Sequence, residues 1–275
     1  AQCKIVDEKG AQQFTNLILY IITPSVIITS FQVTYSRLLV FNMLIAAFIS
    51  ILTHILGALL SKLVFKKEND ERKRILTYST VFFNAGFFAL PLLRAIFGDI
   101  AVMYGSIFVA LFSLISWTYG ISLMETRNNK INYKVVINPG MISIIIALMI
   151  FFFEIKIPSF FQSSLTTLSK VHSPLAMIII GIQFFTFRKN FSIKDRSIWK
   201  TVLIRDLLIP LLILPVVYFL TKDKTLFFSC VLTSAAPTAA NAVLFATKFE
   251  RDVNLAVQAV MLTTIMVLLT VPIIM

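Results

Sequence analysis

The stretch SAAPTAANAVLFA, Ser234 to Ala246, decides how this chain can fold. It lies in strongly apolar sequence, yet it holds Ser, Pro, Thr and Asn within eight residues. Pro237 removes one helix hydrogen bond and clashes with the preceding turn. In a bilayer, each backbone group freed by such a break is costly unless it lines a cavity or is covered by protein. The stretch therefore predicts a broken membrane helix at a functional site, with a simple proline kink as the alternative.

The composition of the whole chain is that of a protein whose solvent is lipid. Hydrophobic residues make up 58% and charged residues 14% of its 275 residues, whereas a soluble domain carries about 25% charged residues. Its long apolar runs can each cross a hydrocarbon core about 30 Å thick, and the short alternating strands of a membrane barrel are not seen. We therefore predict an all-α polytopic protein of the cell membrane, plasma or inner, with nine helices. These run roughly over 14–33, 38–65, 76–97, 100–123, 135–153, 169–187, 200–220, 225–247 and 253–275.

The net charge of +12 indicates orientation in the membrane and not binding of nucleic acid. If residues 1–13 are cytoplasmic and the sides alternate, most Lys and Arg residues fall in cytoplasmic segments, above all 66–74 and 188–200. This is the distribution that the positive-inside rule describes.

Signatures of catalysis and of cofactor binding are missing from the sequence. HExxH, GxSxG and Walker-type glycine loops do not occur, and Cys3 and Cys230 have no zinc or haem spacing. A polytopic membrane enzyme is therefore disfavoured, and we expect no cofactor and no metal site.

Two pairs of similar segments occur in the same order in the two halves of the chain. ITPSVIITSFQ (22–32) is similar to HSPLAMIIIGIQ (172–183), and NAGFFALPLLRAIFGD (84–99) pairs with PTAANAVLFATKFERD (237–252). The agreement predicts an internal repeat. We expect a first repeat over 1–123, a cytoplasmic linker over 124–134 and a second repeat over 135–275.

The second half has a full apolar run before its Pro174 helix, whereas the first has only 13 residues before its Pro24 run. The simplest account is that the first helix is missing from this chain. A complete protein would then have two repeats of five helices. Because five is odd, the two repeats would be inverted relative to each other, as in many transporters.

Two broken helices at corresponding places in an inverted repeat are expected to cross near the membrane midplane. The N-termini of their half-helices carry positive dipole ends that favour anions. We therefore predict a site for a carboxylate-bearing substrate, held by backbone N–H groups and by two amide side chains. Its residues are Asn84, Gly86, Pro91, Ser234, Pro237, Thr238 and Asn241.

Several segments resemble the auxin efflux carrier family. They are NAGFFALPL (84–92), SAAPTAANAVLFATKFERD (234–252), LTTIMVLLTVP (262–272) and INPGMISIIIALM (137–149). The resemblance implies a ten-helix secondary transporter, similar in fold to bile acid symporters, whose broken fourth and ninth helices cross at the substrate site. It places Asn84, Pro91, Pro237 and Asn241 at that crossing. Since the loop 124–134 is short, unlike that of many plant auxin exporters, the chain looks like a bacterial-type permease, a type linked to malate and malonate.

Ionisable residues inside apolar runs are functional candidates by default, among them His54, Asp206 and Arg205. His54 is a candidate proton relay, or a neutral side chain bonded to nearby backbone. Asp206 is a second candidate coupling residue, or the partner of a loop cation. Arg205 is expected to snorkel to the cytoplasmic interface.

The sequence thus predicts a permease that moves a small organic anion by alternating access, with a proton or sodium ion as the coupling ion. The sequence is compatible with a homodimer. Two alternatives stay open: a sodium-coupled carrier like the bile acid symporters, and a membrane sensor on the same fold that transports nothing.

Overall fold

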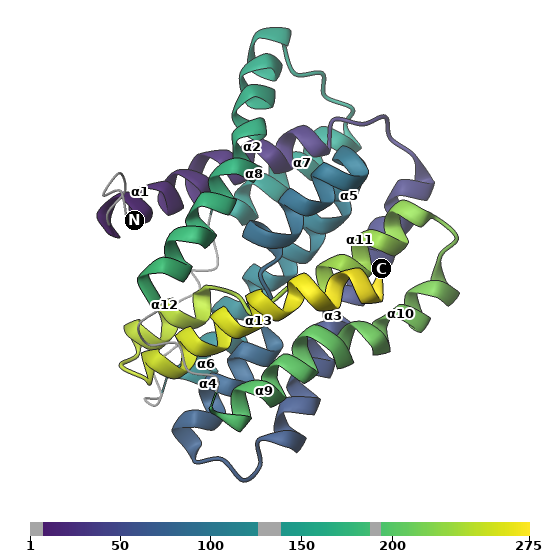
Figure 1. Cartoon of the computed structure of the whole chain (residues 1–275). Helices are drawn as coiled ribbons and strands as arrows, with labels where there is room; N and C mark the ends of the chain where they lie inside the picture. Colours follow the sequence, from purple (N-terminus) through teal and green to yellow (C-terminus); the bar gives the residue numbers. More distant parts are fainter. Residues whose placement is uncertain (1–7, 126–138, 188–193) are drawn as a thin grey trace.

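The computed structural model describes residues 8–125, 139–187 and 194–275, and every regular element in these ranges is a helix (Figure 1). Most of the expected linker 124–134 lies outside the described residues. With α for an α-helix and η for a π-helix, the first elements are α1 (Glu8–Leu17), η1 (Ile18–Ile22), α2 (Thr23–Ser30), α3 (Arg37–Val64), α4 (Asp70–Val81), η2 (Ala85–Ala89), α5 (Leu90–Ile115), η3 (Ser116–Gly120) and α6 (Ile121–Met124). The later ones are α7 (Pro139–Phe152), α8 (Ser159–Phe187), α9 (Arg196–Val202), η6 (Leu203–Leu208), α10 (Ile209–Leu220), α11 (Lys224–Ser234), α12 (Asn241–Lys248) and α13 (Val253–Ile274).

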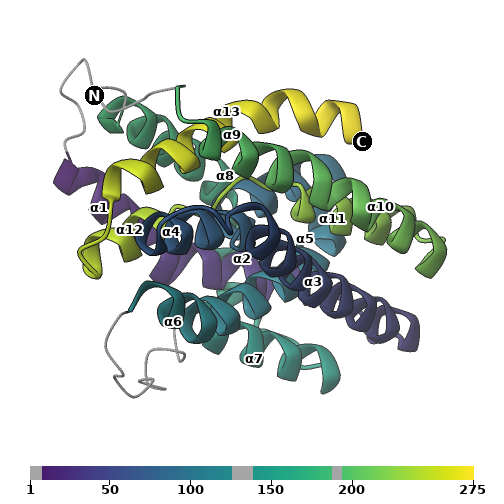
Figure 2. The ribbon, with the colours of Figure 1, turned by 90° about the horizontal axis from the view of Figure 1, so that it is seen from below.

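Helix α3 shows why these residues fold as they do in lipid. Large apolar side chains at helical spacing form an exposed stripe along it, from Leu38 and Phe41 to Leu59 and Leu63. The opposite face buries small and polar residues, among them Ala46, Ser50, Thr53 and Gly57. Small residues on the inner face let membrane helices approach closely. The apolar stripe is therefore the lipid-facing side. Helix α3 packs against α4, α5, α10 and α11 (Figure 2).

Six stretches of the described chain are long and apolar enough to span a membrane: Gln12–Ser30, Arg37–Val64, Ala85–Met124, Ser159–Ile182, Arg196–Leu220 and Val253–Ile274. The shorter Pro139–Phe152 is also apolar. One of the six, Ala85–Met124, is interrupted at Gly98, whose φ of 75° and ψ of −163° are not helical. Glycine adopts this conformation readily because it has no Cβ. The protein is therefore a polytopic helical membrane protein, as the sequence predicts.

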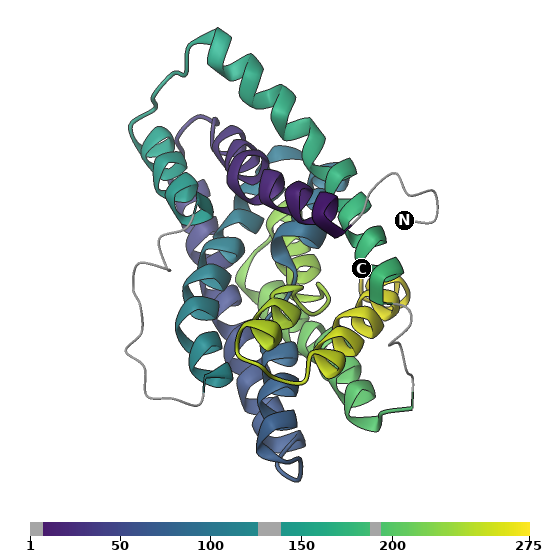
Figure 3. The same ribbon diagram turned by 90° about the vertical axis from the view of Figure 1, so that its left-hand side faces the viewer.

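The helices fall into two groups, which Figure 3 shows from the side. Helices α1, α2, α7 and α8 pack on one another, with η1 among them. The second group contains α3, α4 and α9 to α13, while α5 contacts both groups. Two segments in the second group are interrupted, between α4 and η2 and between α11 and α12. These interruptions are the breaks that the sequence predicts at Asn84 and Pro237.

Candidate functional site

The two breaks meet and are joined through their backbones. Phe83 and Thr238 form an isolated antiparallel bridge. The N–H of Asn84 donates to the carbonyl of Pro237 over 2.7 Å, and the N–H of Ala239 donates to the carbonyl of Phe82 over 2.9 Å. These bonds satisfy backbone groups that the breaks leave without helical partners, which a membrane interior requires. The crossing is thus a short extended pair held inside a helical bundle.

Polar side chains of the second break fix the crossing to its neighbours. The Thr238 hydroxyl donates to the carbonyl of Ser79 over 2.7 Å, and the Thr238 N–H donates to the Thr263 hydroxyl over 3.1 Å. The hydroxyl of Ser234 lies 3.0 Å from that of Thr53. All of these side chains are buried. Ser234 and Thr238 therefore tie the break to α3, α4 and α13.

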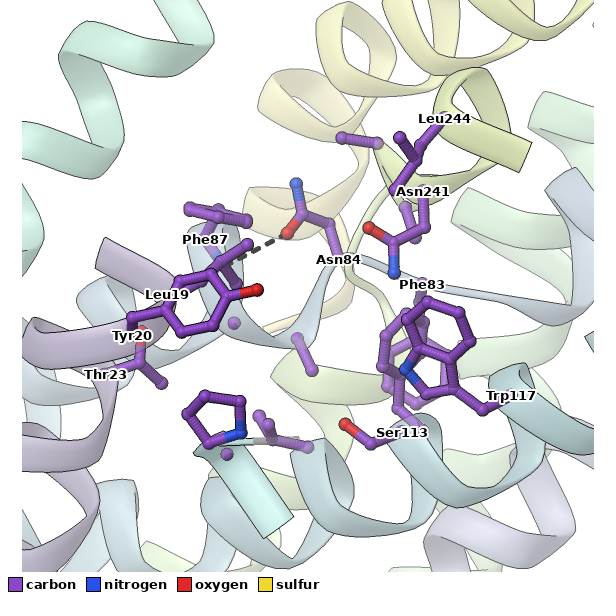
Figure 4. Close-up of a pocket in the computed structure, with 18 residues that line it drawn as sticks. Leu19, Tyr20, Thr23, Phe83, Asn84, Phe87, Ser113, Trp117, Asn241 and Leu244 are labelled. Carbon is purple, nitrogen blue, oxygen red and sulfur yellow. Dashed lines mark hydrogen bonds between the residues drawn. The ribbon is translucent and has the colours of Figure 1, made fainter. Parts of the chain in front are cut away.

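A cavity of about 180 Å³ opens beside the crossing. Figure 4 shows Asn84 and Asn241 on one side of it, with Tyr20 and Trp117 among the aromatic residues around it. Its lining comes from both helix groups, because Tyr20 belongs to η1 and Asn241 to α12. None of the side chains that line the cavity carries a charge. The cavity thus lies at the junction of the two groups and offers neutral polar groups only.

The two amides differ in what they already bind. The Oδ1 of Asn84 accepts the N–H of Phe87 over 3.1 Å and so caps the start of η2. This bond assigns the amide orientation and leaves the Asn84 NH2 as a donor. Helix α12 begins at Asn241, and no side chain caps its first turn. The N–H groups of Ala242 and Val243 in this turn donate to the carbonyls of Ala239 and Ala240, so the helix offers an anion the positive end of its dipole and the Asn241 amide.

The structure therefore separates the predicted site residues into two sets. Asn84, Gly86 and Asn241 line the cavity. Ser234, Pro237 and Thr238 form the crossing itself, and Pro91 is buried in the first turn of α5, away from the lining. A Cβ placed on Gly86 would meet no atom within 4 Å. Gly86 therefore leaves open space beside the break.

The expectation that Arg205 snorkels to the cytoplasmic interface is wrong. Arg205 is fully buried and its guanidinium points into the crossing. Its Nε donates to the carbonyl of Ala236 over 3.1 Å, and its Nη2 donates to the carbonyl of Ser234. The carbon of the guanidinium lies 4.9 Å from the centre of the Phe83 ring. Arg205 lies in the π-helix η6, which begins at Leu203 and shifts the helical register. The prediction used only the depth of Arg205 in the membrane, and depth does not determine which side of the helix a residue faces.

His54 and Asp206 lie near this arginine but outside the cavity. His54 Nδ1 is 2.7 Å from the carbonyl of Ser50, as one of the two interpretations predicts, and its ring packs 4.9 Å from that of Phe83. Asp206 is buried, and neither of its carboxylate oxygens has a hydrogen-bond partner among the described residues. The predicted pairing of Asp206 with a loop cation is also missing from the ion pairs of the described ranges.

Sequence reasoning missed the aromatic wall of the cavity. Tyr20, Phe112 and Trp117 lie in apolar sequence outside the two breaks at the crossing, and their apolar character alone gives no sign that they face a site. No group of three or more His, Cys, Asp and Glu side chains suited to a metal occurs within the part of the chain that the structure describes.

A polytopic bundle with two broken helices that cross beside a cavity has the architecture of a membrane transporter. The family model for membrane transport proteins matches residues 1–275, so the chain belongs to this family, the auxin efflux carrier family. It is also similar to an uncharacterized transporter of Methanocaldococcus jannaschii. The two are 26% identical over an alignment 287 residues long, which covers 97% of this chain and 89% of that protein. The resemblance seen in the crossing motifs is thereby confirmed.

Proposed function

We propose that this membrane transporter is a secondary carrier that moves a small organic anion, and that the anion binds beside the crossing. The observation that carries the proposal is the cavity between Asn84 and Asn241. It combines the amide NH2 of Asn84, the amide of Asn241 at the start of α12 and a lining without acidic groups. Hydrogen bonds to a charged group contribute about 1.5–3 kcal/mol each, so a few such donors support carboxylate binding without a lysine or arginine.

The cavity also limits the kind of anion. At about 180 Å³ it is smaller than the roughly 300–1,000 Å³ of pockets for drug-sized ligands. Phe87, Phe112 and Trp117 line it beside the two amides. The substrate class that fits is a small carboxylate whose carbon body packs against these rings while the carboxylate faces the amides.

The proposed mechanism is alternating access in a fold of two inverted repeats, 1–123 and 135–275, in which the helices of the crossing rock against the remaining helices. Matched breaks at Asn84 and Pro237 that pair at one crossing support this arrangement. The cavity lies where the group of α1, α2, α7 and α8 meets the group that carries the crossing. Rocking one group against the other would open this position to each side of the membrane in turn.

His54 and Asp206 are proposed as coupling residues. Both are buried near the crossing, and the Nε2 of His54 and the carboxylate oxygens of Asp206 have no hydrogen-bond partners among the described residues. Buried ionisable groups in membrane helices are the usual elements of proton relays. Replacement of Asp206 by Asn would abolish a coupled gradient response and leave exchange of substrate across the membrane intact.

Uptake of labelled malate, malonate and phenylacetate into proteoliposomes tests the proposal. We expect saturable uptake of at least one of these carboxylates, loss of uptake in Asn241→Ala, and no uptake of the corresponding uncharged amides. Uptake with and without an imposed pH gradient identifies proton coupling. Folded protein that transports none of the three acids would contradict the proposed substrate class. Binding of an acid without flux would instead support a sensor.

A further inference from the structure

Arg205 occupies the position at the crossing where backbone carbonyls converge. It is the largest fully buried side chain of the described chain. It donates to the carbonyls of Ala236 and Ser234, and its Nη1 lies 3.5 Å from the carbonyl of Thr80. Ser234 ends α11, and Thr80 lies in the last turn of α4. The guanidinium therefore meets the C-terminal ends of the half-helices on both sides of the crossing.

Such helix ends attract a cation. The last carbonyls of a helix lack intrahelical partners and carry the negative end of its dipole. In transporters with broken helices, unwound carbonyls and the C-terminal ends of half-helices hold the coupling cation. A guanidinium remains charged in proteins and presents five donors in one plane, and the face of Phe83 adds a cation–π contact. Arg205 thus supplies both the charge and the donors that these carbonyls require.

We infer that Arg205 is a tethered cation that fills the carbonyl site of the crossing, so that the crossing forms without a sodium ion. Asp206, the next residue along η6, places a carboxyl group in the same buried region. This role of Arg205 concerns the stability of the crossing and its independence of sodium, and it does not depend on the identity of the substrate. It argues against the sodium-coupled alternative.

Thermal unfolding of the purified full chain in detergent tests this inference. We expect the wild-type Tm to be equal in sodium chloride and in choline chloride at the same ionic strength. Arg205→Ala removes the cation and leaves three carbonyls facing a void, so its Tm should fall by roughly 5–15 °C. Guanidinium at millimolar concentration should restore part of the loss in Arg205→Ala. It should leave unchanged both the wild type and Arg196→Ala, a control at an exposed arginine on the adjoining helix α9.

Two further variants keep the inference testable where Arg205→Ala does not fold. Arg205→Lys keeps the charge and should lie between the wild type and Arg205→Met, which has similar length and no charge. A wild-type Tm that rises specifically with sodium would overturn the inference, as would equal Tm values for the Lys and Met variants. So would an Arg205→Ala protein that responds neither to guanidinium nor to sodium. Because the readout is stability, it is independent of whether any carboxylate is transported.

Discussion

The backbone N–H of Asn84 donates to the carbonyl of Pro237 over 2.7 Å, which joins two residues that lie far apart in the chain. The bond pairs the breaks of two membrane helices at a single point. It also places the Asn84 side chain beside the cavity, where its Oδ1 accepts the N–H of Phe87 and caps η2. One residue therefore serves the crossing through its backbone and the proposed substrate through its amide.

Asn84→Asp separates these two roles. The carboxylate retains an oxygen that can cap Phe87, but it removes the NH2 donor and puts a negative charge beside the cavity. We expect the Tm to change little and carboxylate uptake to fall about 10- to 100-fold. Asn84→Ala should lose uptake and also about 0.5–2 kcal/mol of stability with the cap. Uptake by the Asp variant at the wild-type rate would place the anion elsewhere.

Thr263 tests the anchoring of the second break. Its hydroxyl accepts the buried N–H of Thr238, so Thr263→Val leaves that donor without a partner. A buried unsatisfied donor costs about 1–3 kcal/mol. Thermal unfolding should show this loss in Thr263→Val and very little of it in Thr263→Ser, which keeps the hydroxyl. Equal Tm values for both variants would mean that this bond does not stabilise the crossing.

Gly57 is expected to be a close-packing position between α3 and α4. A Cβ on Gly57 would lie 2.9 Å from the Cα of Val81 and 3.2 Å from the carbonyl oxygen of Thr80, next to the first break. Backbone atoms cannot move aside easily, so Gly57→Ala should destabilise the protein by about 1–3 kcal/mol. The matched control is Gly105→Ala, whose Cβ meets only the side-chain ends of Leu90 and Leu93. A larger Tm loss in the control would contradict this account.

Acid should loosen the contact between the starts of α4 and α9. A hydrogen bond from the Ser197 hydroxyl, with help from Arg72, lowers the pKa of the Glu68 carboxyl. Burial raises the pKa of Asp195, but hydrogen bonds from Arg72 and from the Ser197 N–H outweigh it and lower that pKa overall. Carboxyl groups with a lowered pKa stabilise the fold above their unfolded values, about 4, and lose this contribution as the pH falls through the folded values.

Asp195→Asn provides the measurement for this contact. Its Tm should be below that of the wild type at pH 7, and the difference should shrink as the pH falls below about 4. Asp70→Asn is the control, because the Asp70 side chain is 78% exposed and its ion pair with Arg74 is a surface pair. A difference between Asp195→Asn and wild type that persists unchanged at acid pH would exclude the carboxylate charge as its cause.

The sequence predicted the parts of this protein that depend on local chemistry. Pro237 within an apolar run required a break, and the similar motif at Asn84 predicted its partner. Arg205 was misplaced because apolar context gives depth in the membrane, whereas the side that a residue faces depends on local helical register. Tyr20 and Trp117 were missed because only the packing of distant helices brings them to the cavity.

The most direct test of the central claim is whether a carboxylate protects a thiol placed in the cavity. Gly86→Cys suits this purpose because a Cβ there meets no atom within 4 Å and native Cys230 is fully buried; Cys3→Ser removes the remaining thiol. We expect a methanethiosulfonate reagent to label Gly86→Cys, and the transported carboxylate to slow this labelling in a saturable manner while its uncharged amide does not. Labelling at the same rate with and without a carboxylate that the same protein transports would show that the anion does not bind at the crossing.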